Sequence, residues 1–192
     1  VHKSIGVLRQ VRAMAVAENR LVVNPVDKVE LPAVESVEQR FITLEQLHTL
    51  ASAAGDHRAL VYLLGTCGLR FGEVAELRWR DLDLDRLQIR VTRSVTLVDG
   101  KFVIGSPKNG RGRTVSIPEF VADLFDLTGQ DSGQNALVFP DSRGGHMRGT
   151  NVRRRWWSDA VTAAQLFPRT ETTKSGDDTV VYDFKIHELR HT

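Results

Sequence analysis

Apolar residues recur with helical spacing over most of the chain. The N-terminal spacing predicts a helix over about residues 5–20. A capping sequence, Thr43 followed by Gln46, predicts the start of a second helix over residues 44–54. Further helices are predicted over residues 57–67, after Gly72, from Pro118 onward, over residues 150–166 and from about Ile186.

In the central part of the chain, apolar residues begin to recur at every second position instead of with helical spacing. Residues 87–91 alternate between apolar and polar side chains, which predicts a strand. Apolar runs on both sides of Asp99-Gly100, a turn-forming dipeptide, predict a hairpin over residues 95–104, and residues 114–117 predict a further strand. Residues 169–179 are polar and predict a loop. The expected fold class is therefore α+β, mainly α-helical, with a small three-stranded antiparallel sheet.

Three segments are predicted. Residues 1–22 are predicted to be a helical segment that is too short to form a hydrophobic core of its own. Residues 23–40 contain several prolines, which predicts an extended linker. Residues 41–192 are predicted to form the main domain. The helix and linker are typical of the tail of an upstream domain. Because the first residue is Val1 rather than Met, we expect further residues upstream.

The amino-acid composition says little about the function, and the distribution of charge along the chain says more. With 41% hydrophobic and 26% charged residues, the 192-residue chain has the ordinary mixture of a globular protein, and its net charge is only +2. Many arginines nevertheless lie in segments with few carboxylates, and local basic surfaces can bind a polyanion. These residues are Arg111, Arg113, Arg143, Arg148, Arg153, Arg154 and Arg155.

The expected compartment is the cytoplasm. The single cysteine, Cys67, makes neither an internal disulfide nor a cysteine-based metal site. No stretch approaches the roughly 18 apolar residues needed to cross a bilayer, so no membrane partner is expected.

The first candidate motif places Arg70 between Gly68 and Gly72 at a helix–helix junction. Glycine allows a large ligand to approach the backbone, and an arginine there can present its planar fork to a phosphate, with Glu73 placed to hold it. The alternative is a surface arginine paired with Glu73.

Two more basic motifs follow. Residues 107–113, Pro-Lys-Asn-Gly-Arg-Gly-Arg, form a basic loop between strands, for which the alternative is a solvated hairpin tip. Residues 153–157, Arg-Arg-Arg-Trp-Trp, lie on a predicted helix and suit a phosphate-contacting face, although tryptophan more often fills a core.

The last motif, residues 186–192, places His187 and Arg190 on one helix face, where both can reach one phosphate. The same residues match H-E-x-x-H, the zinc-binding helix of metallopeptidases with Glu188 as general base. Zinc needs a third protein ligand, which those enzymes supply further along the chain. A plain helix N-terminus with surface histidines is a third interpretation.

Together these motifs resemble the tyrosine recombinases of the phage-integrase type. Residues 68–83 resemble the first arginine box of that family. Residues 107–108 and 113–118 resemble its lysine-bearing β-hairpin and the following strand. Residues 187–192 resemble its H-x-x-R box. The order and spacing agree across residues 41–192, and residues 1–20 resemble the last helix of the preceding core-binding domain.

The resemblance implies four catalytic residues: Arg70, Lys108, His187 and Arg190. In the family the arginines stabilise the scissile phosphate, the lysine protonates the leaving 5′ oxygen, and the histidine assists proton movement. Asn109 stands where threonine is common in the family, and Lys101 is the alternative lysine.

The basic segments themselves give the expected DNA contacts, Arg111, Arg113, Arg153 and Arg154. No metal and no other cofactor is expected, because the protein–DNA phosphoester keeps the bond energy for religation. The expected partners are double-stranded DNA attachment sites and, for the full-length parent, three further copies in a tetramer on DNA.

The family pattern continues to a tyrosine nucleophile after the H-x-x-R box, whereas Tyr62 and Tyr182 both lie before it and are expected to be structural. We therefore expect a recombinase domain cut short before its nucleophile and inactive as this fragment. The alternatives are a non-catalytic DNA-binding remnant, a type IB topoisomerase and a zinc metallopeptidase.

Overall fold

The computed structural model describes residues 2–33, 39–108, 110–125 and 133–191. The chain divides into two compact units, Val1–Glu38 and Gln39–Thr192. Part of the predicted linker (residues 34–38), Asn109 of the basic loop, Thr192 and the side chain of His191 lie outside the described residues.

The smaller unit consists of helix α1 and a short turn. Helix α1 spans His2–Ala17 and has no buried residue. A 3-10 helix, η1 (Pro25–Lys28), occupies the stretch predicted to be extended; the Asn24 side chain caps it by accepting from the Val26 N–H. Arg9 Nη2 donates to the Val26 carbonyl oxygen over 3.2 Å and so joins α1 to η1.

Helices of the larger unit follow the predicted order. They are α2 (Leu44–Ala53), η2 (Gly55–His57), α3 (Arg58–Thr66), α4 (Phe71–Ala75), η3 (Trp79–Asp81), α5 (Glu119–Ala122), α6 (Gly149–Val152), the π-helical η5 (Arg153–Trp157), α7 (Ser158–Ala163) and the 3-10 helix η6 (Glu188–His191). The capping box at α2 is confirmed: the Gln46 N–H donates to Thr43 Oγ1, and the Thr43 N–H donates to Gln46 Oε1.

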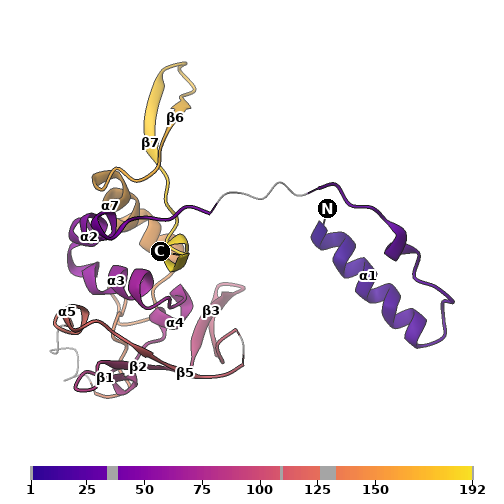
Figure 1. Ribbon diagram of the computed structural model, residues 1–192, viewed down its shortest axis with the longest axis horizontal. Helices are drawn as coiled ribbons and strands as arrows, with labels where there is room; N and C mark the ends of the chain where they lie inside the picture. Colours follow the sequence, from indigo (N-terminus) through magenta and orange to yellow (C-terminus); the bar gives the residue numbers. More distant parts are fainter. Residues whose placement is uncertain (1, 34–38, 109, 126–132, 192) are drawn as a thin grey trace. The chain divides into compact units, whose positions relative to one another are not determined.

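Among the described residues the strands form three small antiparallel sheets, which lie in different parts of the larger unit (Figure 1). One has the order β1–β2–β5, built from β1 (Leu82–Asp83), β2 (Gln88–Val91) and β5 (Arg113–Ser116). The second is the hairpin of β3 (Ser94–Val98) and β4 (Lys101–Gly105), and the third pairs β6 (Pro168–Thr172) with β7 (Asp178–Tyr182).

The α+β class and the three-stranded antiparallel sheet are confirmed. The sheet takes its edge strand from residues 82–83, where no strand was predicted, and the hairpin over 94–105 pairs only with itself. The predicted polar loop over 169–179 is wrong, because β6 and β7 pair there from Pro168 with Tyr182 to Thr172 with Asp178.

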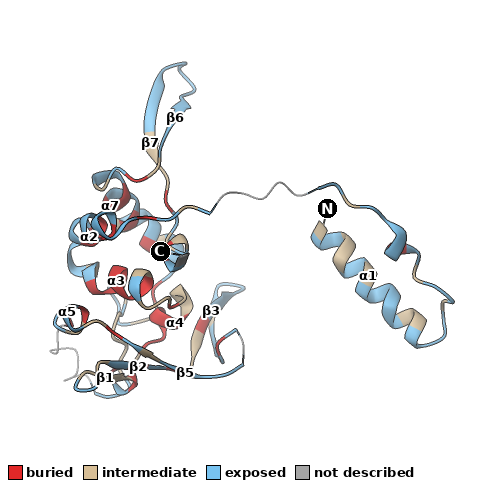
Figure 2. Ribbon diagram, viewed as in Figure 1, coloured by how far each residue is buried: buried red, intermediate tan, exposed pale blue. Residues whose placement is uncertain are grey.

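The core of the larger unit places the candidate residues. Figure 2 shows buried residues concentrated on α2, α3, α4 and α7, while β6 and β7 are largely exposed. Leu69 and Leu189 are fully buried. Each is followed directly by a candidate arginine, Arg70 or Arg190, so burial of the leucines fixes the backbone from which these side chains reach the surface.

The β3–β4 hairpin packs on α4 through a glycine. A Cβ atom added at Gly72 would lie 2.5 Å from the Val95 carbonyl oxygen and 2.8 Å from Ser94 Oγ. The absence of a side chain at Gly72 therefore lets the hairpin backbone approach the helix that follows Arg70.

We predict that Gly72→Ala lowers the free energy of unfolding by about 2 kcal/mol, because the added methyl group meets backbone rather than a flexible side chain. Gly105→Ala on the same hairpin is the matched control, since a Cβ there has no neighbour within 4 Å. Thermal or urea denaturation measures both. Equal stability of the two variants would contradict this account of the hairpin packing.

Candidate functional site

Arg70 is held by a buried carboxylate at the start of α4. Its backbone N–H donates to Glu73 Oε2 over 2.8 Å, and its Nη1 donates to Glu73 Oε1 over 3.1 Å. The Glu73 side chain has no exposed surface, whereas that of Arg70 is 27% exposed. The guanidinium is therefore fixed from the protein side while part of it remains open to a ligand.

Arg113 of β5 binds the same carboxylate. Its Nη1 donates to Glu73 Oε1 over 2.9 Å, and its Nη2 donates to Glu73 Oε2 over 2.7 Å. This is the bidentate geometry in which arginine binds carboxylates most strongly. Arg113, predicted as a DNA contact, thus has two of its nitrogens engaged inside the protein.

The cluster of Arg70, Glu73 and Arg113 carries a net positive charge. Burial acts to raise the pKa of Glu73, but hydrogen bonds from Arg113 and from the Arg70 backbone outweigh it, so the pKa lies below its ordinary value. The same pairing raises the pKa of Arg113. Two arginines share one ionised carboxylate, which leaves one charge uncompensated for an anion.

Arg190 reaches the loop that precedes Arg70. Its Nε donates to the Gly68 carbonyl oxygen over 3.0 Å, although the two residues are 122 positions apart. Gly68 has φ +59°, a left-handed conformation that favours glycine. The structure thus brings Arg190 to the turn from which Arg70 emerges.

His187 lies near two basic side chains, those of Arg153 and Lys185. Its exposed side chain lines a pocket of about 200 Å³ together with Arg153 of η5 and Lys185. Lys185 was not predicted; its only sequence signal is its place just before the histidine box. Arg154 is exposed and, with Arg153, lines a different surface pocket on the same helix.

The remaining predicted residues lie away from these contacts. Lys108 and Arg111 are exposed in the connection between β4 and β5. Lys101, the alternative lysine, pairs with Val98 at the far end of β4, next to the hairpin turn. No hydrogen bond within the described residues joins these three side chains to Arg70 or Arg190.

The zinc interpretation finds no support in the geometry. Both carboxylate oxygens of Glu188, its proposed general base, accept hydrogen bonds from Arg40. Among the side chains that the structure describes, which do not include that of His191, no group of three or more histidine, cysteine, aspartate or glutamate residues is arranged to hold a metal ion.

Tyr62 and Tyr182 are both packed against other residues of the domain. Tyr62 is 6% exposed on α3, and its hydroxyl lies 2.7 Å from His48 Nδ1. Tyr182 ends β7, where it pairs with Pro168 and packs against the core.

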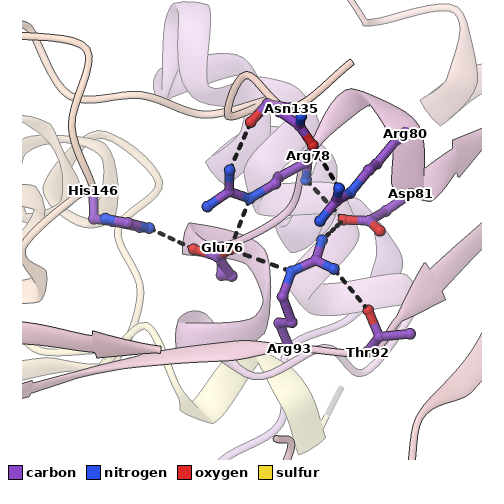
Figure 3. Close-up of polar contacts among 8 residues, drawn as sticks. All are labelled: Glu76, Arg78, Arg80, Asp81, Thr92, Arg93, Asn135 and His146. Atoms are coloured by element: carbon purple, nitrogen blue, oxygen red, sulfur yellow. Dashed lines mark hydrogen bonds and ion pairs between the residues drawn. The ribbon is translucent and has the colours of Figure 1, made fainter. Parts of the chain in front are cut away.

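A second buried carboxylate, Glu76, lies at the other end of α4 (Figure 3). Its side chain has no exposed surface; Oε1 accepts from Arg78 Nε over 2.8 Å and from Arg93 Nε over 3.3 Å, and Oε2 contacts His146 Nε2. Burial acts to raise the pKa of Glu76, but the hydrogen bonds from Arg78 and His146 outweigh it and lower the pKa.

This Glu76 network joins segments that are distant in the sequence, and sequence analysis gave no sign of it. Arg93, just before β3, also binds Asp81, and Arg78 Nη1 donates to the Asn135 carbonyl oxygen (Figure 3). His146 in addition packs on Phe102 of β4, with ring centroids 5.2 Å apart. The root of the hairpin and the loop before α6 are therefore fixed to α4.

The fold and the site together define an α+β domain with a cluster of anchored arginines suited to an oxyanion. Residues 40–192 match the Phage integrase family, and the chain belongs to that family. It is 33% identical over 148 residues to an integrase of Mycobacterium phage D29, covering 72% of this chain and 39% of that protein. The chain thus spans well under half of the length of this relative.

Solved structures show the same fold. The integrase of transposon Tn1549, in complex with a circular intermediate DNA, superposes with a TM-score of 0.74 at 18% identity, over 99% of this chain and 63% of that one. A lambda integrase tetramer bound to a Holliday junction gives a TM-score of 0.60 at 17% identity, over 97% and 50% of the two chains. Among the described residues, no helix has the length and apolar character to span a membrane.

We predict that Glu73→Gln lowers the free energy of unfolding at neutral pH by about 3 kcal/mol, because two arginines lose their buried anionic partner. The variant should also lose less stability in acid. Glu73 has its pKa lowered from 4.5, so the unfolded chain takes up the proton first and stability falls as the pH drops below that value.

The measurement is urea denaturation from neutral pH to the acid limit of folding. Glu45→Gln, which removes an exposed carboxylate on α2, is the control and should retain the wild-type acid profile. A Glu73→Gln profile parallel to that of the wild type would show that Glu73 is not ionised by its arginine partners.

Proposed function

We propose that this chain is the phosphate-binding part of a site-specific DNA recombinase that breaks and rejoins strands through a phosphotyrosine. The observation that carries the proposal is the convergence on the Gly68–Arg70 turn: Arg190 donates to the Gly68 carbonyl, and Glu73 holds Arg70 two residues later. Positioned guanidinium groups stabilise the charge that develops on a phosphoryl group in the transition state.

In this proposal Arg70 and Arg190 bind the scissile phosphate, and His187 assists proton movement beside them. Lys108, exposed between β4 and β5, protonates the leaving 5′ oxygen. Arg111, Arg153 and Arg154 contact neighbouring phosphates, which their exposure allows. Arg113 contributes charge and holds Glu73. The reaction needs no metal and no nucleotide, because the phosphotyrosine bond conserves the energy for religation.

The nucleophile in this proposal comes from outside the 192 residues. Tyr62 is buried against His48 and Tyr182 belongs to the β6–β7 hairpin, so neither is placed to attack a phosphate held by Arg70. The chain by itself should bind DNA without cleaving it. The proposed partners are a double-stranded attachment site and further copies of the protein in a tetramer. Residues 1–22 would end a preceding DNA-binding domain.

We predict that DNA binding by the chain depends steeply on salt and weakly on base sequence, because its contacts are to phosphates. The affinity for a duplex oligonucleotide should fall at least tenfold between about 50 and 200 mM salt. Arg70→Ala and Arg190→Ala should each weaken binding, whereas Arg86→Ala, which removes an exposed arginine beside Asp83, should change it little. Fluorescence anisotropy measures these affinities. A flat salt profile would exclude phosphate-dominated binding.

A further prediction concerns strand cleavage. Appending a recombinase C-terminal segment that carries the tyrosine should produce a covalent protein–DNA adduct on nicked DNA. Arg70→Ala or Arg190→Ala should then reduce its formation by about 10³-fold, since each removes a charge that the transition state needs. Denaturing gel electrophoresis with labelled DNA detects the adduct.

Two outcomes of that experiment would contradict the proposal. An adduct formed by the 192-residue chain at Tyr62 or Tyr182 would show that a different residue attacks the phosphate. Failure of a correctly folded extended chain would favour a DNA-binding remnant without catalytic function.

A further inference from the structure

Arg40, at the start of the larger unit, binds the histidine box at the other end of the chain. Its Nη2 donates to Glu188 Oε1 over 2.9 Å and to Glu188 Oε2 over 2.8 Å, and its Nε donates to Oε1 over 3.1 Å. The two residues are 148 positions apart. Glu188 lies directly between His187 and Leu189, so this ion pair is made within the candidate active-site segment.

Each nitrogen of the Arg40 guanidinium donates a hydrogen bond to the protein. Its Nη1 donates to the Asp183 carbonyl oxygen, and its guanidinium carbon lies 4.9 Å above the centre of the Phe167 ring. Its side chain is 29% exposed and that of Glu188 is 17% exposed. With every nitrogen donating to the protein and one face on an aromatic ring, Arg40 is poorly placed to contact DNA itself.

Glu188 also fixes the local backbone. Its Oε2 accepts from the Lys185 N–H over 2.6 Å, so one carboxylate holds both ends of the turn that leads into η6. Helix η6 has four residues, and a 3-10 segment of that length has little intrinsic stability. Its orientation must therefore come from tertiary contacts, which include the Arg40–Glu188 pair, the buried Leu189 and the hydrogen bond from Arg190 to the Gly68 carbonyl oxygen.

The consequence concerns His187 and Arg190. The Arg190 N–H donates to the His187 carbonyl over 3.3 Å, a 3-10 hydrogen bond that places side chains three positions apart on the same side of the turn. The contacts that fix the backbone at Glu188 therefore also fix the directions in which the side chains of His187 and Arg190 leave the turn.

We propose that Arg40 is a positioning residue for phosphate binding: through Glu188 it holds His187 and Arg190 toward the anion that Arg70 also binds. This inference rests on the proposed function. It assigns a part in the site to Arg40, the last residue of the predicted linker, which would act through Glu188 and not by contacting the phosphate itself.

The test compares Arg40→Ala, Arg190→Ala and the double variant in the 192-residue chain, by the salt dependence of its binding to duplex DNA. Losing one phosphate contact reduces the slope of log affinity against log salt by about 1. Arg190→Ala should show this reduction, Arg40→Ala should show most of it, and the double variant should be no worse than Arg190→Ala alone. Arg86→Ala is the charge-matched control.

A second variant separates positioning from stability. Replacing both partners with apolar residues, Arg40→Met with Glu188→Met, should recover folding stability because no buried charge is left unpaired. The DNA affinity of this double variant should remain as low as that of Arg40→Ala. Recovery of affinity together with stability would show that Arg40 has only a structural role and would overturn the inference. Arg40→Lys, which keeps the charge without the bidentate fork, provides a milder variant if Arg40→Ala does not fold.

Two other outcomes are decisive. Additive effects of Arg40→Ala and Arg190→Ala would mean that Arg40 acts independently of Arg190, and would overturn the inference while leaving the proposed function intact. If Arg70→Ala and Arg190→Ala themselves leave binding unchanged, the proposed phosphate site is what fails.

Discussion

Glu73 lies on the short helix α4 and Glu76, three positions later, caps its C-terminal end; neither side chain has exposed surface. An ionised carboxylate removed from water is stable only when cations and hydrogen-bond donors replace its hydration. Each glutamate therefore binds one arginine close to it in the sequence and one from a more distant segment. Glu73 binds Arg70 and Arg113, and Glu76 binds Arg78 and Arg93. The position of the site, the β3–β4 hairpin and the sheet relative to α4 all depend on satisfying these two charges.

The same principle divides the basic residues of the larger unit into two groups. Some are held by buried or half-buried carboxylates and have fixed directions, as Arg70 is by Glu73 and Arg40 is by Glu188. Others, such as Lys108, Arg111 and Arg154, are exposed, and no such anchor holds them among the residues that the structure describes. A phosphate site needs both kinds, because anchored guanidinium groups offer charge without reorganisation, whereas exposed ones can follow the backbone of a flexible duplex.

The fold is retained at 17–18% identity to DNA-bound integrases, so most side chains can change without changing the architecture. What constrains the chain is the set of contacts between elements, such as the close approach of Val95 to Gly72. The match to H-E-x-x-H illustrates the limit of a short pattern. Its glutamate has the spacing of a general base, yet its tertiary partner is Arg40, which no local sequence rule indicates.

Short sequence patterns predicted those features that depend on interactions between residues close together in the chain. The capping box at Thr43, the alternation over residues 87–91 and the placing of Glu73 beside Arg70 each predicted a feature that the structure contains. The β6–β7 hairpin was missed because nearly all of its residues are exposed, so neither face shows the apolar alternation that marks a half-buried strand. The Arg40–Glu188 pair and the Glu76 network join residues far apart in the chain, and an ion pair leaves no periodicity in either segment. The sequence by itself determined the α-helices, the class of fold and the candidate arginines, but not the short 3-10 helices. Only the tertiary structure decided which carboxylate holds each arginine, because a buried charge selects its partner by proximity in space and not by spacing along the chain.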